Sequence, residues 1–138
     1  KKGAPSANLG ERLRTDMKAF QAWFDETVTR WMAGTYDDEP GVEPWPAFCS
    51  RVETGMRQIM AEQGRGRRLA VFTSGGPISV VVKAALGLSD RKTVDISWVV
   101  YNASITRLKY SGQALSLIGF NETSHLLIDG GQALITLR

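Results

Sequence analysis

Apolar residues near the start of the chain recur at helical spacing. Steps of three or four residues separate Leu13, Met17, Phe20, Phe24, Val28 and Trp31. This period predicts an amphipathic helix over about residues 9–33 that ends at Gly34, with its aromatic stripe packed in a core. After a proline-rich loop, a second helix is predicted over about residues 46–63. Its apolar face comprises Phe48, Val52, Met56 and Ile59.

The centre of the chain combines an apolar run with a glycine pair. Residues 69–72 are apolar throughout, which is typical of an internal parallel strand that is buried on both faces. Gly75 and Gly76 follow and predict a tight turn. Pro77 suits the first turn of a helix, which we expect to continue until Gly87. The apolar positions of this helix are Ile78, Val81, Val82, Ala85 and Leu86.

This strand, turn and helix together suggest an anion site. Free N–H groups and the positive end of the dipole at a helix start attract phosphate or carboxylate. The expected donors are the Ser74 hydroxyl and the amides of Gly75 and Gly76, and Ser74 is also expected to cap the helix. A purely structural turn would have the same sequence, so both interpretations stay open.

Polar and apolar residues alternate over residues 102–110, which predicts a half-exposed strand. Ser111 and Gly112 mark a turn, and residues 114–120 return as the second strand of an antiparallel hairpin. Residues 93–101 fit a helix and a strand equally well. Residues 133–137 predict a short strand or an extended tail.

Composition excludes several classes of function. The net charge of +3 is small and dispersed, so we expect no nucleic-acid partner. No apolar run approaches the roughly 20 residues of a membrane span. The single cysteine, Cys49, cannot form an internal disulfide, which suits the cytoplasm, and we expect it to be buried and inert. The acidic run at residues 37–39 matches no calcium loop, so a solvated loop is preferred and neither metal nor cofactor is expected.

Four segments in this order carry a family resemblance. They are EPWPAFCSRV at residues 43–52, LAVFTSGGPI at 69–78, YNASITRL at 101–108 and FNETSHL at 120–126. Together they resemble the C-terminal half of the histidine phosphatase superfamily, the phosphoglycerate-mutase-like proteins. The resemblance implies an α/β three-layer sandwich with a mostly parallel sheet and a C-terminal hairpin. It also implies one domain over residues 1–138, the C-terminal part of a larger one, with a helical cap at 9–34 and the core at 43–138.

The chain departs from the family pattern at the catalytic positions. The family's nucleophilic histidine lies in an Arg-His-Gly sequence, which does not occur here. Ser74 stands where the family has its second active-site histidine, and the single histidine, His125, matches a C-terminal position instead. We therefore expect no phosphohistidine catalysis by this chain. A Ser74–His125 pair with Asp95 or Asp129 would give a serine triad, but a histidine that holds the chain end is preferred.

The expected ligand is a phosphorylated small molecule or another anion. Two function classes remain: part of a phosphomonoester hydrolase or transferase, and a non-catalytic anion-binding or protein-interaction module. The strand at residues 69–73 would have an unprotected edge without the family's N-terminal strand. We therefore expect a homodimer or association with an N-terminal segment.

Overall fold

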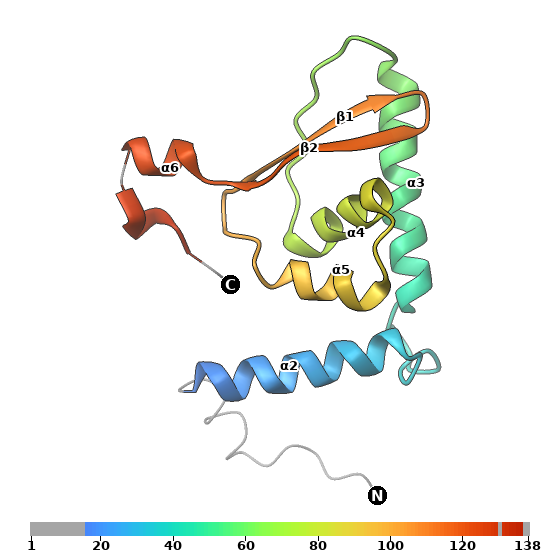
Figure 1. The fold of residues 1–138 in the computed structure, drawn as a ribbon. Helices are drawn as coiled ribbons and strands as arrows, with labels where there is room; N and C mark the ends of the chain where they lie inside the picture. Colours follow the sequence, from blue (N-terminus) through green and yellow to red (C-terminus); the bar gives the residue numbers. More distant parts are fainter. Residues whose placement is uncertain (1–15, 130, 137–138) are drawn as a thin grey trace, which may run out of the picture. The chain divides into compact units, whose positions relative to one another are not determined.

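A computed structural model describes residues 16–129 and 131–136 (Figure 1). By its internal contacts the chain divides into two compact units, Lys1–Trp45 and Pro46–Arg138, and each is described by itself. The predicted start of the first helix at residue 9, and Leu13 of its stripe, lie outside the described residues.

The described part of the first unit is built around helix α2, Met17–Met32. The Asp16 carboxylate caps its start and accepts hydrogen bonds from the backbone N–H groups of Lys18 and Ala19, at 3.0 and 3.2 Å. The helix ends at Met32 with Ala33 as its C-cap residue, and Gly34 follows with a φ of 76°. The predicted end of this helix at the glycine is therefore confirmed.

The aromatic stripe of α2 is only partly buried. The Phe20 ring lies 6.1 Å from that of Trp23 and 6.0 Å from that of Phe24. Trp23 and Phe24 remain 43% and 38% exposed, so the predicted core packing is wrong at Phe24, which belongs to the stripe. Their rings contact a neighbour on the same helix, and this contact leaves their outer sides open.

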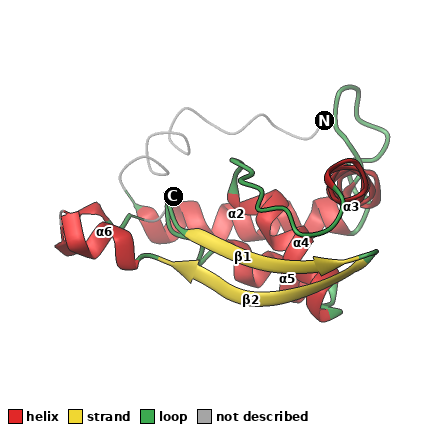
Figure 2. Ribbon diagram, turned by 90° about the horizontal axis from the view of Figure 1, so that it is seen from above, coloured by secondary structure: helices red, strands yellow, loops and turns green. Residues whose placement is uncertain are grey.

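The second unit contains the remaining elements. In chain order they are α3 (Trp45–Gln63), α4 (Gly75–Leu86), α5 (Asp90–Ser97), β1 (Ile105–Ser111), β2 (Ala114–Glu122), α6 (Ser124–Asp129) and the 3-10 helix η1 (Gly131–Leu134). The second predicted helix corresponds to α3, and α4 contacts both α5 and β2. Of the ambiguous residues 93–101, residues 93–97 continue α5 and residues 98–101 form neither a helix nor a strand. The start of α5 is capped by the Ser89 hydroxyl, which accepts from the Lys92 N–H at 3.3 Å. Among the described residues, β1 and β2 form the only sheet (Figure 2).

The best-buried side chains come from α3, α4 and α5. Val80 is fully buried, and the other buried apolar residues of these helices include Met60, Cys49, Val82 and Val94. The buried face of α4 differs from the predicted one, because it contains Ser79 and Val80, whereas Leu86 is 54% exposed. Ser79 can be buried because its hydroxyl donates to the Gly75 carbonyl at 2.8 Å.

The predicted hairpin is confirmed. β1 and β2 pair antiparallel with Leu108 opposite Leu117 and Lys109 opposite Ser116. Burial alternates along β1 as the sequence alternates, so one face of the hairpin is covered and the other is open. Gly112 has a φ of 60° in the connecting turn, a backbone conformation that favours glycine.

The predicted central strand is wrong. Residues 67–74 form an extended segment between α3 and α4 that pairs with no described strand (Figure 1). Val71 is 55% exposed and Phe72 is 95% exposed, whereas the sequence predicted burial on both faces. A strand needs neighbours for its backbone N–H and C=O groups, and no described residue forms a backbone–backbone hydrogen bond with residues 67–73. The class is therefore mixed α/β, and the described sheet is antiparallel rather than mostly parallel.

The end of the described chain returns to the start of the hairpin. The Asn102 N–H donates to the Thr136 carbonyl at 2.9 Å, and the Asn102 amide donates to the Thr136 hydroxyl at 3.0 Å. The short strand predicted over residues 133–137 is not found among the described residues of that range. Residues 133 and 134 belong to η1 instead.

Candidate functional site

The predicted anion site lies at the start of α4. Ser74 is the N-cap residue with extended backbone torsions, φ −99° and ψ 172°, but its side chain makes no capping bond. The predicted capping role of this hydroxyl is therefore wrong. Ser74 is exposed, and its carbonyl accepts the Ile78 N–H at 3.2 Å, the first bond of the helix.

The predicted tight turn at Gly75 and Gly76 is wrong, because both glycines belong to the first turn of α4 and neither has a positive φ. Gly75 is buried, and a Cβ added there would lie 3.5 Å from the Ser97 carbonyl oxygen and 3.6 Å from Val100 Cβ. A Cβ on Gly76 would lie 3.5 Å from the end of the Phe48 ring. These are ordinary contact distances, so neither glycine is required by sterics alone. The more accessible donors of the turn belong to Ser74 and Gly76.

His125 holds α6 to the segment before β1. Its Nε2 lies 3.0 Å from the Ala103 carbonyl oxygen. A carbonyl oxygen only accepts, so Nε2 carries the proton and donates it in this bond. This contact agrees with the prediction that His125 holds the chain end.

The possible serine triad is not assembled among the described side chains. Asp95 forms ion pairs with Arg91 at 2.9 Å and with Lys92 at 3.2 Å along α5. His125 is directed to a backbone carbonyl, and no contact joins it to Ser74. The side chain of Asp129, the other predicted carboxylate, lies outside the described atoms.

Asn121 has a structural role that the sequence did not reveal. It has a φ of 58°, an uncommon value for a residue other than glycine that asparagine tolerates. Its Oδ1 accepts the Tyr101 N–H at 2.8 Å, and its Nδ2 donates to the Val99 carbonyl. It therefore joins the end of β2 to the segment that follows α5. Asn121 belongs to the FNETSHL segment that carries the family resemblance, but that resemblance assigned it no structural role.

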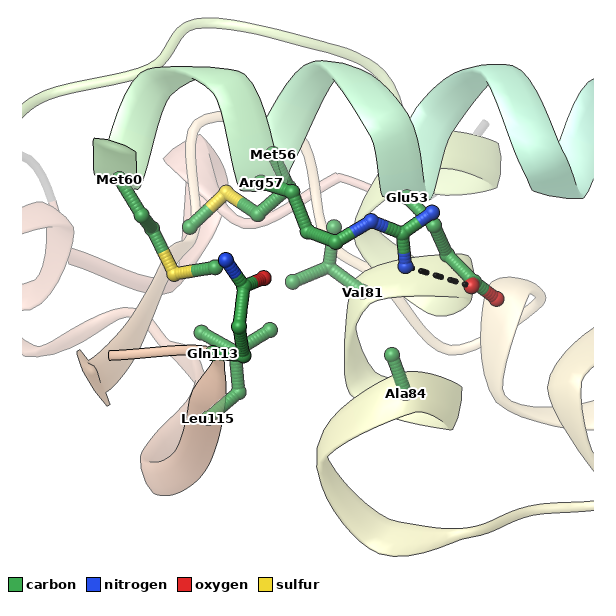
Figure 3. Close-up of a pocket in the computed structure, with 8 residues that line it drawn as sticks. All are labelled: Glu53, Met56, Arg57, Met60, Val81, Ala84, Gln113 and Leu115. Atoms are coloured by element: carbon green, nitrogen blue, oxygen red, sulfur yellow. Dashed lines mark hydrogen bonds and ion pairs between the residues drawn. The ribbon is translucent and has the colours of Figure 1, made fainter. Parts of the chain in front are cut away.

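An open groove lies between α3, α4 and the hairpin turn (Figure 3). Its volume is about 290 Å³, and it is lined by Glu53, Met56, Arg57, Met60, Val81, Ala84, Gln113 and Leu115. Arg57 forms an ion pair with Glu53 at 3.4 Å at one side of it. The lining includes no serine, cysteine or histidine, so this groove offers no nucleophile. None of the predicted site residues belongs to it.

The environment of the single thiol, that of Cys49, disfavours reactivity. Cys49 is 6% exposed on α3, and burial raises the pKa of its thiol, although Lys83 acts weakly in the opposite direction. The thiolate is the reactive form, so a raised pKa disfavours nucleophilic chemistry. Lys83 itself bonds to Asp90 Oδ1 at 2.5 Å, and this hydrogen bond raises the pKa of the Lys83 ammonium.

The described residues contain no group of three or more histidine, cysteine, aspartate or glutamate side chains arranged to hold a metal ion. The acidic residues Asp37, Asp38 and Glu39 are exposed in turns. Within residues 16–129 and 131–136, no helix combines the length and apolarity that a membrane crossing requires.

A sequence model of the histidine phosphatase superfamily (branch 1) matches residues 8–123. The match includes the segment predicted as a helical cap, the Ser74–Gly76 turn and the hairpin. It ends two residues before His125. No curated protein and no solved structure matches the chain significantly.

Proposed function

Because the chain belongs to the histidine phosphatase superfamily, we propose that it is a phosphatase-like module that binds a phosphomonoester or a similar anion at Ser74 and Gly76. The observation that supports this proposal is the exposed Ser74 hydroxyl at the start of α4, which makes no capping bond. An anion there would accept from the hydroxyl and from the first free amides of the helix. Gly75 would position the turn by its packing against the end of α5.

We propose further that this chain does not itself perform phosphohistidine chemistry. The sequence contains no Arg-His-Gly and a single histidine, and the Nε2 of that histidine donates to Ala103. Serine at position 74 offers a neutral hydrogen bond where a histidine would offer a charged one. Charged hydrogen bonds are about twice as strong, so phosphate should bind weakly.

The larger three-layer sandwich with a mostly parallel sheet belongs to this proposal as well. Residues 67–74 run extended into α4, as a parallel strand does before its crossover helix. In such a sandwich these residues would gain neighbouring strands on their free edges. The described hairpin would then form an antiparallel edge of that sheet.

The binding proposal is tested by titrating inorganic phosphate while following backbone amide shifts. We expect movement of the Gly76 amide in the wild type, weaker binding in Ser74→Ala, and tighter binding in Ser74→His at a pH where the imidazole is charged. Ser116→Ala, on the exposed face of the hairpin, is the matched control and should behave as wild type. Unmoved amides at residues 74–76 in the wild type would refute the anion site.

The catalytic proposal is tested with an aryl phosphate substrate. We expect no turnover above the level of a Ser74→Ala, His125→Ala double variant. Turnover that survives His125→Ala and disappears in Ser74→Ala would contradict this proposal and indicate serine chemistry.

The second candidate function is a non-catalytic interaction module. It is favoured by one observation, the exposed apolar segment before α4, where Phe72 is 95% exposed. Binding of a protein to this segment would not require phosphate. A protein-binding assay therefore tests the interaction module, and the phosphate titration tests the anion site.

A further inference from the structure

We propose that Asn121 is a positioning residue of the anion site at the start of α4. This inference rests on the proposed function, since it concerns the site at Ser74 and Gly76, and it adds a residue from the hairpin to that site. Asn121 acts through Val100, which packs against Gly75, rather than through contact with the anion. The steps of the argument are a bulge in β2, two hydrogen bonds around Val100, and the packing of Val100 on α4.

An irregularity in the hairpin places Asn121 where it can reach the segment after α5. Ile105 pairs with Glu122. Arg107 pairs with Gly119, so β2 has two residues between these partners where β1 has one. An extra residue of this kind is a β-bulge, which redirects a side chain and is common beside functional sites. Asn121 lies in this bulge with a φ of 58°, so the strand bends at this residue.

The Asn121 amide holds the backbone on both sides of Val100. Its Oδ1 accepts the Tyr101 N–H at 2.8 Å, and its Nδ2 donates to the Val99 carbonyl. These two groups belong to the two peptide units that flank Val100. Because one planar side-chain amide bonds to both units, it restrains the backbone torsions of Val100 and thereby the direction of the valine side chain.

Val100 in turn lies against Gly75, the first residue of α4. A Cβ added to Gly75 would lie 3.6 Å from Val100 Cβ and 3.5 Å from the Ser97 carbonyl oxygen. Gly75 is buried and Val100 is 7% exposed, so this contact is part of the packed interior. A packed interior has few voids that could absorb a displacement, so it transmits one. A shift of Val100 should therefore move Gly75 and the neighbouring donors of Ser74 and Gly76.

The proposed anion site is sensitive to such a shift because its donors are neutral. The Ser74 hydroxyl and the Gly76 amide form hydrogen bonds about half as strong as charge-assisted ones. Hydrogen bonds also weaken steeply once their angle falls well below the preferred value. Several neutral donors therefore bind an anion well only when they are held in the correct directions before it arrives. Asn121 supplies part of that preorganisation.

The test compares wild type with Asn121→Gly by titrating inorganic phosphate while following backbone amide shifts. Glycine tolerates a φ of 58°, so this variant loses both side-chain hydrogen bonds and keeps the backbone conformation. Measurements are made well below the unfolding midpoint of each variant, so that folded chains are compared. We expect phosphate affinity to fall about fivefold, as for mutations that act through packed neighbours. The Gly75 and Gly76 amides should shift even without phosphate.

Asn102→Ala is the matched control. The Asn102 amide donates to the Thr136 hydroxyl at 3.0 Å, so this variant also loses a side-chain hydrogen bond of the segment before β1. That bond holds the chain end and not the peptide units of Val100. Asn102→Ala should therefore leave phosphate affinity and the amide shifts at the start of α4 unchanged. If Asn121 only stabilised the fold, the two variants would bind phosphate equally well.

Val100→Ala tests the contact with α4 directly. The truncation removes the methyl group that would lie 3.9 Å from a Cβ on Gly75. We expect a loss of phosphate affinity similar to that of Asn121→Gly. The double variant should bind about as weakly as either single variant, because both changes act through the same contact. Independent effects would instead multiply.

Three outcomes would overturn the inference. They are unchanged Gly75 and Gly76 shifts in Asn121→Gly, equal losses of affinity in Asn102→Ala, and losses that multiply in the double variant. Absence of phosphate binding by the wild type would instead refute the proposed function. The amide shifts measured without phosphate would still decide whether Asn121 positions the start of α4.

Discussion

The hairpin β1–β2 and the segment at residues 67–74 are similar in sequence character but differ in the structure. Both contain branched or aromatic residues and both are extended. The hairpin provides its own partner strand through a two-residue turn, and α4 contacts β2. The segment before α4 has no paired strand among the described residues, and Phe72 is exposed. Local sequence therefore specifies an extended backbone, whereas burial depends on which other strands are present.

The largest expected effect contrasts a buried residue of α4 with an exposed residue of the preceding segment. Val80→Ala should lower the free energy of unfolding by about 2 kcal/mol, because Val80 is completely buried and truncation leaves a cavity. Phe72→Ala should change it by less than about 0.5 kcal/mol. Urea denaturation followed by circular dichroism measures both. A loss at Phe72 as large as that at Val80 would show that residues 67–74 are packed in solution.

The second effect tests how the hairpin is joined to the rest of its unit. Asn121→Ala should cost about 2 kcal/mol, because it removes the bonds to Tyr101 and Val99 and leaves an alanine at positive φ. Asn121→Gly removes the same bonds but relieves the backbone, so it should cost less. Equal stabilities of the two variants in the same denaturation experiment would show that backbone strain plays no part.

A smaller effect concerns the ion pair that joins α4 to the start of α5. The Lys83–Asp90 bond raises the pKa of Lys83 above its ordinary value of 10.5 in the folded chain. The folded state then holds this proton more tightly, so the stabilisation is present below pH 10.5 and is lost as the pH rises through the folded pKa. Lys83→Met should cost about 0.5 kcal/mol at pH 7 and nothing at high pH.

Lys92→Met is the matched control for this ion pair, because Lys92 is 69% exposed and its partner Asp95 retains Arg91. Thermal unfolding at pH 7 and above pH 11 measures the difference between the two variants. A cost for Lys83→Met that does not change with pH would contradict the ion-pair explanation and indicate lost packing.

The reactivity of Cys49 tests whether the buried residues of α3 are also protected in solution. Burial raises the pKa of this thiol, so at pH 8 the native chain should hold less thiolate than the unfolded chain. Alkylation by iodoacetamide should therefore be about tenfold slower or more in the native state. Mass spectrometry at timed intervals measures the rate of alkylation. Equal rates in native buffer and in urea would show that Cys49 is not buried in the native chain.

The sequence predicted the elements that depend on local signals. The helices ended at Gly34 and Gly87 as expected, and the hairpin followed from its alternation and its Ser111–Gly112 turn. Prediction from the sequence failed where burial depends on contacts between residues that are far apart in the chain. Ser79 is buried because the Gly75 carbonyl accepts its proton, and residues 69–72 are exposed because no described strand adjoins them. Among site residues, Ser74 was correctly placed before a helix, but its lack of a capping bond had no signal in the sequence.

The contacts of Asn121 also have a consequence for the order in which the molecule opens. The Asn121 side chain, near the end of β2, forms hydrogen bonds with the backbone of Val99 and Tyr101. The next residue, Asn102, forms a backbone hydrogen bond with Thr136. Fraying of the C-terminal end cannot spread into the hairpin without first releasing the Asn121 amide. The residues from α5 to the end of β2 should therefore exchange their amides as a single cooperative foldon, separate from that of the more weakly held end.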